Sequence, residues 1–359
     1  MTISGKQNHY DIKILSGYGY SISVRNQRIV LKNGTDVFTD TSETEQYIPT
    51  ALPYSRLVLV GKNGYISTKA IHLLSENHIS LIFLDTFGNL KASIQEDMSS
   101  FTGVHRRMGQ YDTFRDGTKC LTLQKDLVVR KLQSEIDFVF DDFVKARLVR
   151  FQQYVRNAKS YKEILSFEAK AGIIWRNYYA SLFDEKYEYD SRKNAGRRAK
   201  PRYATHVINA LLNYGFSILY SEVAKNIHAQ GLDAYFGFYH KSHESEQALV
   251  YDLVEPYRIL VESAVLEFSK TEPRWNKLDK CVKLDEKHHY QIILDDVCLK
   301  RFLETLSRKF NEKRMYVSRY GNRGKATEEA LTRESTIMKL EIENLQLLVV
   351  NSILNKSDM

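Results

Sequence analysis

The chain has 359 residues, of which 43% are hydrophobic and 12% aromatic, so it can bury sizeable cores and is not a disordered protein. It has no run of 18 apolar residues, and its N-terminal MTISGKQNHYDIK lacks a signal-peptide pattern, which predicts a soluble, cytoplasmic protein with no membrane partner. The formal net charge of +8 favours a polyanionic partner, and the three isolated cysteines argue against a disulfide framework or a CxxC zinc site.

The first hundred residues show the pattern of β-strands. YGYSISVRNQRIVLK (18–32) and LVLVGKNGYISTKAI (57–71) alternate β-branched or aromatic residues with polar ones, and KNG turns interrupt them. STKAIHLLSENHI (67–79) has the spacing of a short amphipathic helix that leads into the buried strand ISLIFLD (79–85). The pattern predicts a small N-terminal β domain over 1–107.

After residue 120 the period changes to that of helices. Residues 123–155 keep apolar side chains at three-and-four spacing, and similar patterns recur at 161–183, 205–229, 250–270, 291–315 and 328–353. MGQYDTFRDGTK favours a linker over 108–120. The predicted fold class is therefore α+β, with a small, sandwich-like β domain followed by a larger all-α domain over 121–359.

One basic stretch, SRKNAGRRAKPR (191–202), interrupts the helical half. Its Gly196 and Pro201 disfavour a helix, and a loop of this kind suits sequence-independent contacts with phosphates. The alternative is an ordinary solvated loop. We expect six cations to make these phosphate contacts, namely Arg192, Lys193, Arg197, Arg198, Lys200 and Arg202.

An acid pair lies in LVYDLVEPYR (249–258). Asp252 and Glu255 are three residues apart in a helical pattern, which predicts that both carboxylates lie on one face, close enough to share a cation. Pro256 predicts a kink or a new helix start at this point. His240 ends the aromatic segment YFGFYH and can approach from a loop. On spacing alone, these residues could equally form a turn followed by an acidic helix start.

A third carboxylate, Glu168, lies in SFEAKAGIIWRNYYASLF (166–183). It shares a helical face with Ala171 and Trp175, where an unpaired charge is unfavourable, so it needs a partner cation or hydrogen bonds. Two or three carboxylates with one imidazole suit manganese or magnesium better than structural zinc. Beside a basic loop, such a metal site favours phosphodiester chemistry.

Five segments, in order along the chain, resemble the CRISPR-associated Cas1 family of integrases and endonucleases. The most specific is HVINALLNYGFSILYSEV (206–223), and GLDAYFGFYH (231–240) is similar to the segment that ends in the metal-binding His of the family. The others are ALVYDLVEPYR (248–258), FEAKAGIIWRNYYASLF (167–183) and GKNGYISTKAIHLLSENHISLIFLDTFGNL (61–90).

The resemblance implies that Glu168, His240 and Glu255 hold Mn²⁺ or Mg²⁺, and that Asp252 is an accessory ligand or a DNA-site acid. It also implies an N-terminal β domain, a helical catalytic domain, a homodimer and a probable Cas2 dimer as partner. The reaction would join a spacer 3′-hydroxyl to a repeat phosphodiester in CRISPR antiviral defence, with nuclease and disintegration activity on double-stranded and branched DNA. Asn209 and Tyr214 would buttress the site.

Two other interpretations remain open. A casposase-type transposon integrase uses the same catalytic domain but usually carries an added C-terminal helix-turn-helix, which we do not expect after RYGNRGKATEEA. A DNA-binding scaffold without catalysis would have no reason to keep Glu168, His240 and Glu255 together.

Overall fold

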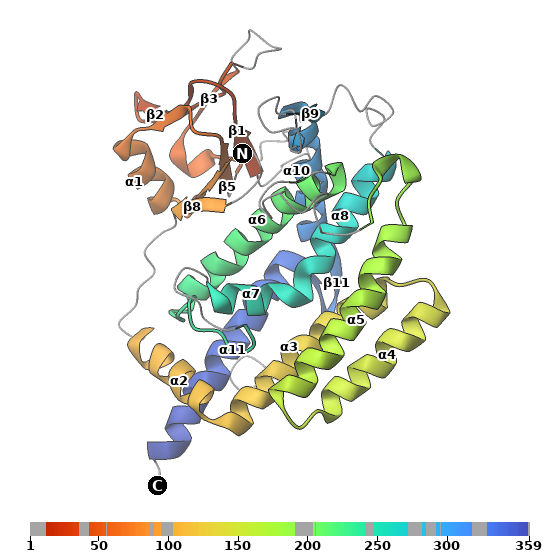
Figure 1. Cartoon of the computed structure of the whole chain (residues 1–359). Helices are drawn as coiled ribbons and strands as arrows, with labels where there is room; N and C mark the ends of the chain where they lie inside the picture. Colours follow the sequence, from red (N-terminus) through yellow and green to blue (C-terminus); the bar gives the residue numbers. More distant parts are fainter. Residues whose placement is uncertain are drawn as a thin grey trace. The chain divides into compact units, whose positions relative to one another are not determined.

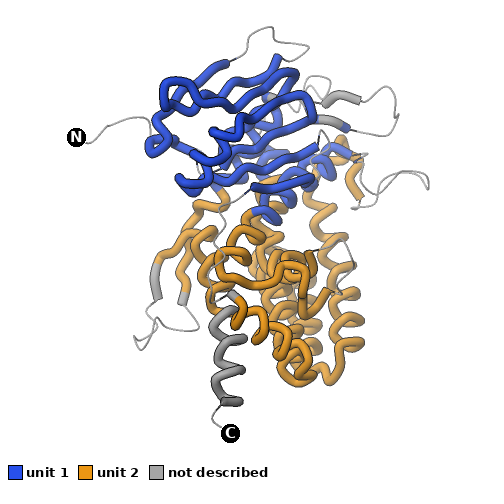
Figure 2. The backbone as a smooth tube through the Cα atoms, turned by 90° about the vertical axis from the view of Figure 1, so that its left-hand side faces the viewer, with its two compact units in different colours: residues 1–97, 193–221, 267–308 blue, residues 98–192, 222–266, 309–359 orange. Residues whose placement is uncertain are grey.

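The computed structural model describes residues 12–35, 43–54, 56–85, 90–94, 103–190, 204, 206–240, 247–271, 282–284, 292–294, 296–317 and 329–357. Its chain forms two compact units. One comprises residues 1–97, 193–221 and 267–308, and the other comprises 98–192, 222–266 and 309–359 (Figure 2). The first unit therefore joins the N-terminal strands to two later segments. The domain limits expected from the sequence stay a prediction.

The N-terminal strands form two four-stranded sheets. One has the order β4-β3-β2-β6 and the other β1-β5-β7-β8, in which β1, β5 and β7 run parallel and β8 antiparallel. Asn26 and Gln27, both with positive φ, form the two-residue turn of the β2–β3 hairpin. The strands are β1 (Ile12–Leu15), β2 (Tyr20–Arg25), β3 (Arg28–Lys32), β4 (Thr44–Tyr47), β5 (Arg56–Val60), β6 (Gly64–Ile66), β7 (Ser80–Leu84) and β8 (Leu90–Ile94).

Both sheets share one hydrophobic core with the helix α1 (Thr68–Glu76). Ile22 and Leu31 from the first sheet, Leu57 from the second and Leu74 from α1 belong to the same buried cluster. The hydroxyl of Ser67 caps α1 by accepting a hydrogen bond from the amide of Ala70. The predicted helix over 67–79 and the buried strand after it are confirmed.

The described residues after β8 are mostly helical (Figure 1). In the second unit α3, α4 and α5 pack on one another, and α2 packs against α11. The helices are α2 (Gly103–Arg115), α3 (Gly117–Phe138), α4 (Asp142–Asn157), α5 (Tyr161–Ser181), α6 (Val207–Ala229), α7 (Ala248–Val254), α8 (Arg258–Thr271), α10 (Asp296–Asn311) and α11 (Glu334–Ser357), with short 3₁₀ helices η1 (Pro49–Ala51), η2 (Glu185–Tyr187) and η3 (Glu255–Tyr257). The expected α+β fold, strand-rich first and helical afterwards, is confirmed.

Three details differ from the sequence expectation. Residues 108–120, expected to be a linker, lie in α2 and α3 apart from Asp116, whose carboxylate caps α3. The helical pattern over 123–155 is broken at 139–141, because Asp141 accepts a hydrogen bond from the amide of Val144 and starts a new helix. Periodicity alone does not reveal a break at which the apolar spacing continues on both sides.

The C-terminal half is also not all-α. Its described residues include two short antiparallel pairs, β9 (Val282–Leu284) with β10 (Ile292–Leu294) and β11 (Lys313–Val317) with β12 (Glu329–Arg333). Strands of three to five residues are too short for their period to be separated from that of the adjoining helices, which is why the helical patterns predicted at 291–315 and 328–353 run over β10, β12 and the start of β11. Among the described residues, no helix is long and apolar enough to cross a membrane.

Candidate functional site

The loop that ends in His240 is held by three helices of the second unit. From α3, Gln124 donates a hydrogen bond to the carbonyl of Phe238 at 2.8 Å, and from α5 the Tyr161 hydroxyl donates to the carbonyl of Tyr239 at 3.1 Å. From α2, the Gln110 amide donates to two carbonyls earlier in the same loop. These contacts fix the path of a segment that has no regular secondary structure of its own.

Asp252 on α7 organises the end of this loop. Its side chain is fully buried and accepts hydrogen bonds from the amides of Phe238, Tyr239 and His240, at 2.5, 2.9 and 2.7 Å. Gly237 makes this approach geometrically feasible, because a Cβ there would lie 2.9 Å from Asp252 Oδ2 and 2.8 Å from a backbone carbon. Asp252 therefore holds the end of this loop in place, and in this conformation its carboxylate is fully buried.

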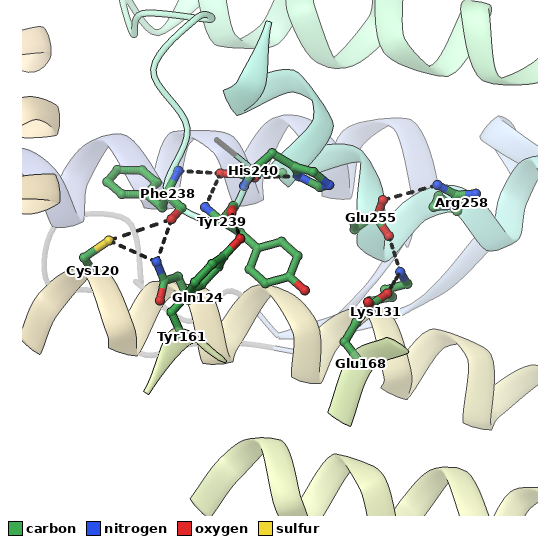
Figure 3. A network of polar contacts seen from close by, with 11 residues as sticks. Cys120, Gln124, Lys131, Tyr161, Glu168, Phe238, Tyr239, His240, Glu255 and Arg258 are labelled. Atoms are coloured by element: carbon green, nitrogen blue, oxygen red, sulfur yellow. Dashed lines mark hydrogen bonds and ion pairs between the residues drawn. The ribbon is translucent and has the colours of Figure 1, made fainter. Parts of the chain in front are cut away.

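The imidazole of His240 is the fourth group on this carboxylate. Nδ1 lies 2.8 Å from Asp252 Oδ1, and the ring lies between the 238–239 segment and Glu255 (Figure 3). Burial disfavours the charged ring, but the hydrogen bond to Asp252 and the nearby carboxylates outweigh burial and raise the pKa of His240. A carboxylate on one ring nitrogen is the usual device that orients a histidine whose other nitrogen binds a metal.

The two glutamates of the predicted ligand set meet on a single ammonium group. Lys131 Nζ on α3 lies 2.5 Å from Glu168 Oε1 on α5 and 2.6 Å from Glu255 Oε2 in η3 (Figure 3). The contact to Glu255 is an ion pair without hydrogen-bond geometry. The three side chains are only 15%, 19% and 12% exposed, so they are weakly screened by solvent.

These ion pairs keep the site charged. Burial disfavours the charge on Lys131, but the surrounding carboxylates, with Glu255 first among them, raise the pKa of the ammonium. Burial would raise the pKa of Glu255, yet Lys131 and Arg258 together lower it to about 2. Arg258 Nη1 lies 3.2 Å from the other oxygen of Glu255. Both groups are therefore ionised at neutral pH.

Two more buried carboxyl groups, Glu135 and Glu262, interact electrostatically with this cluster. Glu135, one helical turn after Lys131, is 5% exposed, and its Oε2 has no hydrogen-bond partner. Burial, only partly opposed by Lys131, raises the pKa of Glu135 to about 8. Burial likewise raises the pKa of Glu262 on α8. The Glu135 carboxyl is thus largely neutral at pH 7, where the two glutamates of the cluster are paired.

The donors present fit a hard divalent cation. Carboxylate oxygens with one imidazole suit Mn²⁺ or Mg²⁺. The two carboxylates, Glu168 and Glu255, are already paired with a buried cation, the ammonium of Lys131. Within the described residues, however, no three His, Cys, Asp or Glu side chains are grouped as a ready metal cluster. Lys131 holds the two glutamates, while the His240 ring faces Asp252.

The structure shows the partners of the three carboxylates that the sequence singled out, Asp252, Glu255 and Glu168. Asp252 turns to the His240 loop while Glu255 turns to Lys131 and Arg258, so the two carboxylates have different partners here, and the expectation that they share a cation stays a prediction. The helix also changes to 3₁₀ geometry at Glu255, next to Pro256, as expected for a proline at that point. The need of Glu168 for a partner cation is confirmed, and Lys131 is that cation.

The remaining expectations concern residues that do not belong to the cluster around Lys131 and His240. Asn209 and Tyr214 are buried in α6, and their proposed role as a buttress stays a prediction. All six cations of the basic stretch 191–202 lie outside the described residues.

Sequence reasoning missed Lys131, Glu135 and Gln124. All three lie on α3 at spacings of four or seven residues, along the same stripe as the buried Val128. A charged or amide side chain on the buried stripe of an amphipathic helix must find a polar partner in the interior. That pattern was visible in LQKDLVVRKLQSEIDF and is the signal that could have found them.

Comparison with known proteins identifies the relatives of this chain. A family model described as CRISPR associated protein Cas1 matches residues 14–308. A CRISPR-associated endonuclease Cas1 of Archaeoglobus fulgidus is 25% identical over 330 residues, 85% of this chain and 90% of the relative. A second, from Francisella tularensis subsp. novicida, is 28% identical over 264 residues, 70% of this chain and 77% of the relative.

Solved structures show the same fold. A casposase bound to its integration product superposes with a TM-score of 0.81 at 23% identity, covering 95% of this chain and 91% of that one. A chain of a Cas6-RT-Cas1–Cas2 complex gives a TM-score of 0.70 at 16% identity, covering 98% of this chain and 36% of that longer one.

Proposed function

The chain belongs to the CRISPR-associated Cas1 family, and from that premise we propose that it is a metal-dependent DNA endonuclease and integrase that inserts spacers during CRISPR adaptation. The observation that carries the proposal is the convergence of Glu168 and Glu255 on one buried cation beside a histidine oriented by a carboxylate. A purely structural role does not require such an arrangement of a histidine and two glutamates from three elements.

Each residue of the site has a defined task in this proposal. Glu168, Glu255 and the Nε2 atom of His240 would hold Mn²⁺ or Mg²⁺, which when bound polarises a phosphodiester and stabilises charge on the oxygens of an in-line displacement. Asp252 keeps Nδ1 of His240 engaged, so that Nε2 is the nitrogen left for a ligand. Gln124 and Tyr161 hold the loop that carries the ring.

The reaction is a transesterification of DNA. A spacer 3′-oxygen forms a new bond to the phosphorus of a repeat phosphodiester, while the bond from that phosphorus to the 3′-oxygen of the repeat breaks and the released hydroxyl takes up a proton. With water in place of the spacer hydroxyl, the same step is endonuclease cleavage. The mechanism needs no covalent protein–DNA intermediate.

DNA and protein partners follow from the same premise. The neighbouring structures hold an integration product in one case and a Cas1–Cas2 complex in the other, which supports double-stranded or branched DNA and a Cas2 dimer as partners here. We also assign this chain a homodimeric state and a basic DNA contact at residues 191–202. The net charge of +8 agrees with a polyanionic partner.

The decisive experiment is strand transfer and disintegration on branched DNA in the presence of Mn²⁺. We expect activity for the wild type and for His105→Ala, an exposed control on α2, but none for His240→Ala or Glu168→Ala, with DNA binding retained in all four. Equal activity of His240→Ala and wild type would contradict the proposal. So would a wild type that stays inactive when Cas2 is added.

A casposase-type transposon integrase is the second candidate. The observation in its favour is the higher TM-score of the casposase structure, although at 23% identity this likeness shows the fold alone. Both candidates use the same chemistry, so only the substrate separates them. Preferential integration into a CRISPR repeat supports the first candidate, and preferential joining of transposon ends supports the second.

A further inference from the structure

Lys131 occupies a central place in the candidate site. Its ammonium contacts Glu168 and Glu255 at once, from a third helix, and its side chain is only 15% exposed. Two carboxylates brought together without a cation would repel each other, and one of them would take up a proton. In the metal-free protein, the Lys131 ammonium thus offsets the negative charge of the two carboxylates, as a divalent cation would in the metal-bound protein.

An ammonium and a divalent cation cannot share this position. Both would bind the same two carboxylates, and like charges at such a short distance in a poorly solvated site repel strongly. Binding of a metal to Glu168 and Glu255 therefore requires Lys131 to leave the space between them. The leaving ammonium needs a new acceptor, because an unpaired buried charge is costly.

Glu135 is the acceptor that the structure offers. It lies four residues after Lys131 on the same helix face, is more than nine-tenths buried, and has an oxygen without a hydrogen-bond partner. Side chains at this spacing are neighbours on a helix, so the lysine reaches Glu135 by a change of rotamer alone. Burial keeps a proton on this carboxyl, and an ammonium beside it favours loss of that proton, so the displaced lysine would pair with a carboxylate.

We propose that Lys131 is the built-in counter-ion of the site, which holds Glu168 and Glu255 together before a metal binds and moves to Glu135 when a divalent cation takes its place. This inference rests on the proposed metal site and adds to it a residue that sets metal affinity. Lys131 is a positioning residue, not a ligand. The two carboxylates are kept ionised and close together, and the metal binds in competition with the lysine.

The test is calorimetric titration of the full chain with MnCl₂ after treatment with EDTA, together with thermal melting in EDTA. Lys131→Met keeps the length of the side chain without its charge. We expect it to bind Mn²⁺ about tenfold more tightly than wild type, within the usual range of coupling between competing ligands, and to melt at a lower temperature without metal. The Mn²⁺-induced rise in melting temperature should be larger than in wild type.

A second variant on the same helix should change affinity in the opposite direction. Glu135→Gln removes the carboxyl group that, on losing its proton, receives the displaced lysine, so Mn²⁺ should bind more weakly than to wild type. Lys125→Met is the matched control, because it removes a lysine from α3 without touching the ion pairs to Glu168 and Glu255. We expect wild-type affinity for it. Lys131→Arg should restore most of the metal-free stability.

The outcomes separate this inference from the proposed function. Mn²⁺ binding to wild type with equal or weaker binding to Lys131→Met overturns the inference and leaves the metal site intact. Unchanged binding in Glu135→Gln overturns Glu135 as the acceptor. If neither wild type nor Lys131→Met binds Mn²⁺, the metal site itself is refuted, and the inference is refuted with it.

Discussion

Asp252 accepts hydrogen bonds from both the main chain and the ring of His240, at 2.7 and 2.8 Å. One fully buried carboxylate therefore fixes the position of the residue and the orientation of its imidazole. Two further amides of the same loop bind the other oxygen. The site thus depends on a residue that cannot itself contact a substrate in this conformation.

Asp252→Asn tests this dependence. An amide nitrogen cannot accept from the loop amides, so a donor would face a donor in the buried interior. We expect a loss of about 3 kcal/mol in the free energy of unfolding, measured by urea denaturation. Without the hydrogen bond and the charge, burial dominates, so the pKa of His240 should fall, as followed by NMR titration in EDTA. An unchanged His240 pKa would show that Asp252 does not control the ring.

Gly237→Ala tests the close approach of the loop to α7. The added Cβ would lie 2.8 Å from a backbone carbon of Ala248, which cannot move without shifting the helix. We expect destabilisation of about 2 kcal/mol, measured by urea denaturation, and reduced strand transfer. Gly117→Ala is the matched control, since nothing lies within 4 Å of its Cβ in the first turn of α3. It should be neutral or slightly stabilising. Equal stability of both variants would contradict the close approach.

Glu135→Gln should flatten the pH dependence of stability. In the native state Glu135 keeps its proton up to about pH 8, whereas in the unfolded chain it loses it near the ordinary glutamate pKa of 4.5. The native state thus binds more protons in this window, so the contribution of Glu135 to stability falls as pH rises, by at most about 1.4 kcal/mol per pH unit. The neutral amide lacks this dependence, so the variant should gain stability over wild type towards pH 8.

Urea denaturation in EDTA at pH 5, 6, 7 and 8 measures this difference. Glu185→Gln, which changes an exposed carboxylate, serves as the control and should follow the wild-type curve. Parallel curves for wild type and Glu135→Gln would show that Glu135 does not hold a proton in the native state.

The basic stretch 191–202 can be tested without knowledge of its conformation. Replacing Arg197, Arg198, Lys200 and Arg202 with alanine should weaken binding to DNA of any sequence. The slope of log K against log salt concentration should become shallower by about 0.9 for each phosphate that the variant no longer neutralises. Fluorescence anisotropy at several salt concentrations measures this slope. An unchanged slope would exclude the stretch as a DNA contact.

Much of the fold followed from local patterns. Alternation with KNG turns predicts the strands of the N-terminal unit, and three-and-four spacing predicts the long helices, because both reflect the burial of one face of an element. The patterns failed where a strand is only a few residues long, and where the apolar spacing continues across a break between two helices. The strands after residue 281 are three to five residues long, and the break before Asp142 leaves the apolar spacing intact.

The candidate site, too, could be predicted only in part from the sequence. The sequence by itself determined that Glu168, on an apolar stripe, needs a partner cation or hydrogen bonds, because a buried unpaired charge is unstable in any fold. Only the tertiary structure decided that this cation is Lys131, which is 37 residues away and also binds Glu255, 124 residues from it in the chain. Spacing reports which side chains share a helix face, whereas the packing of α3, α5 and η3 determines which faces meet.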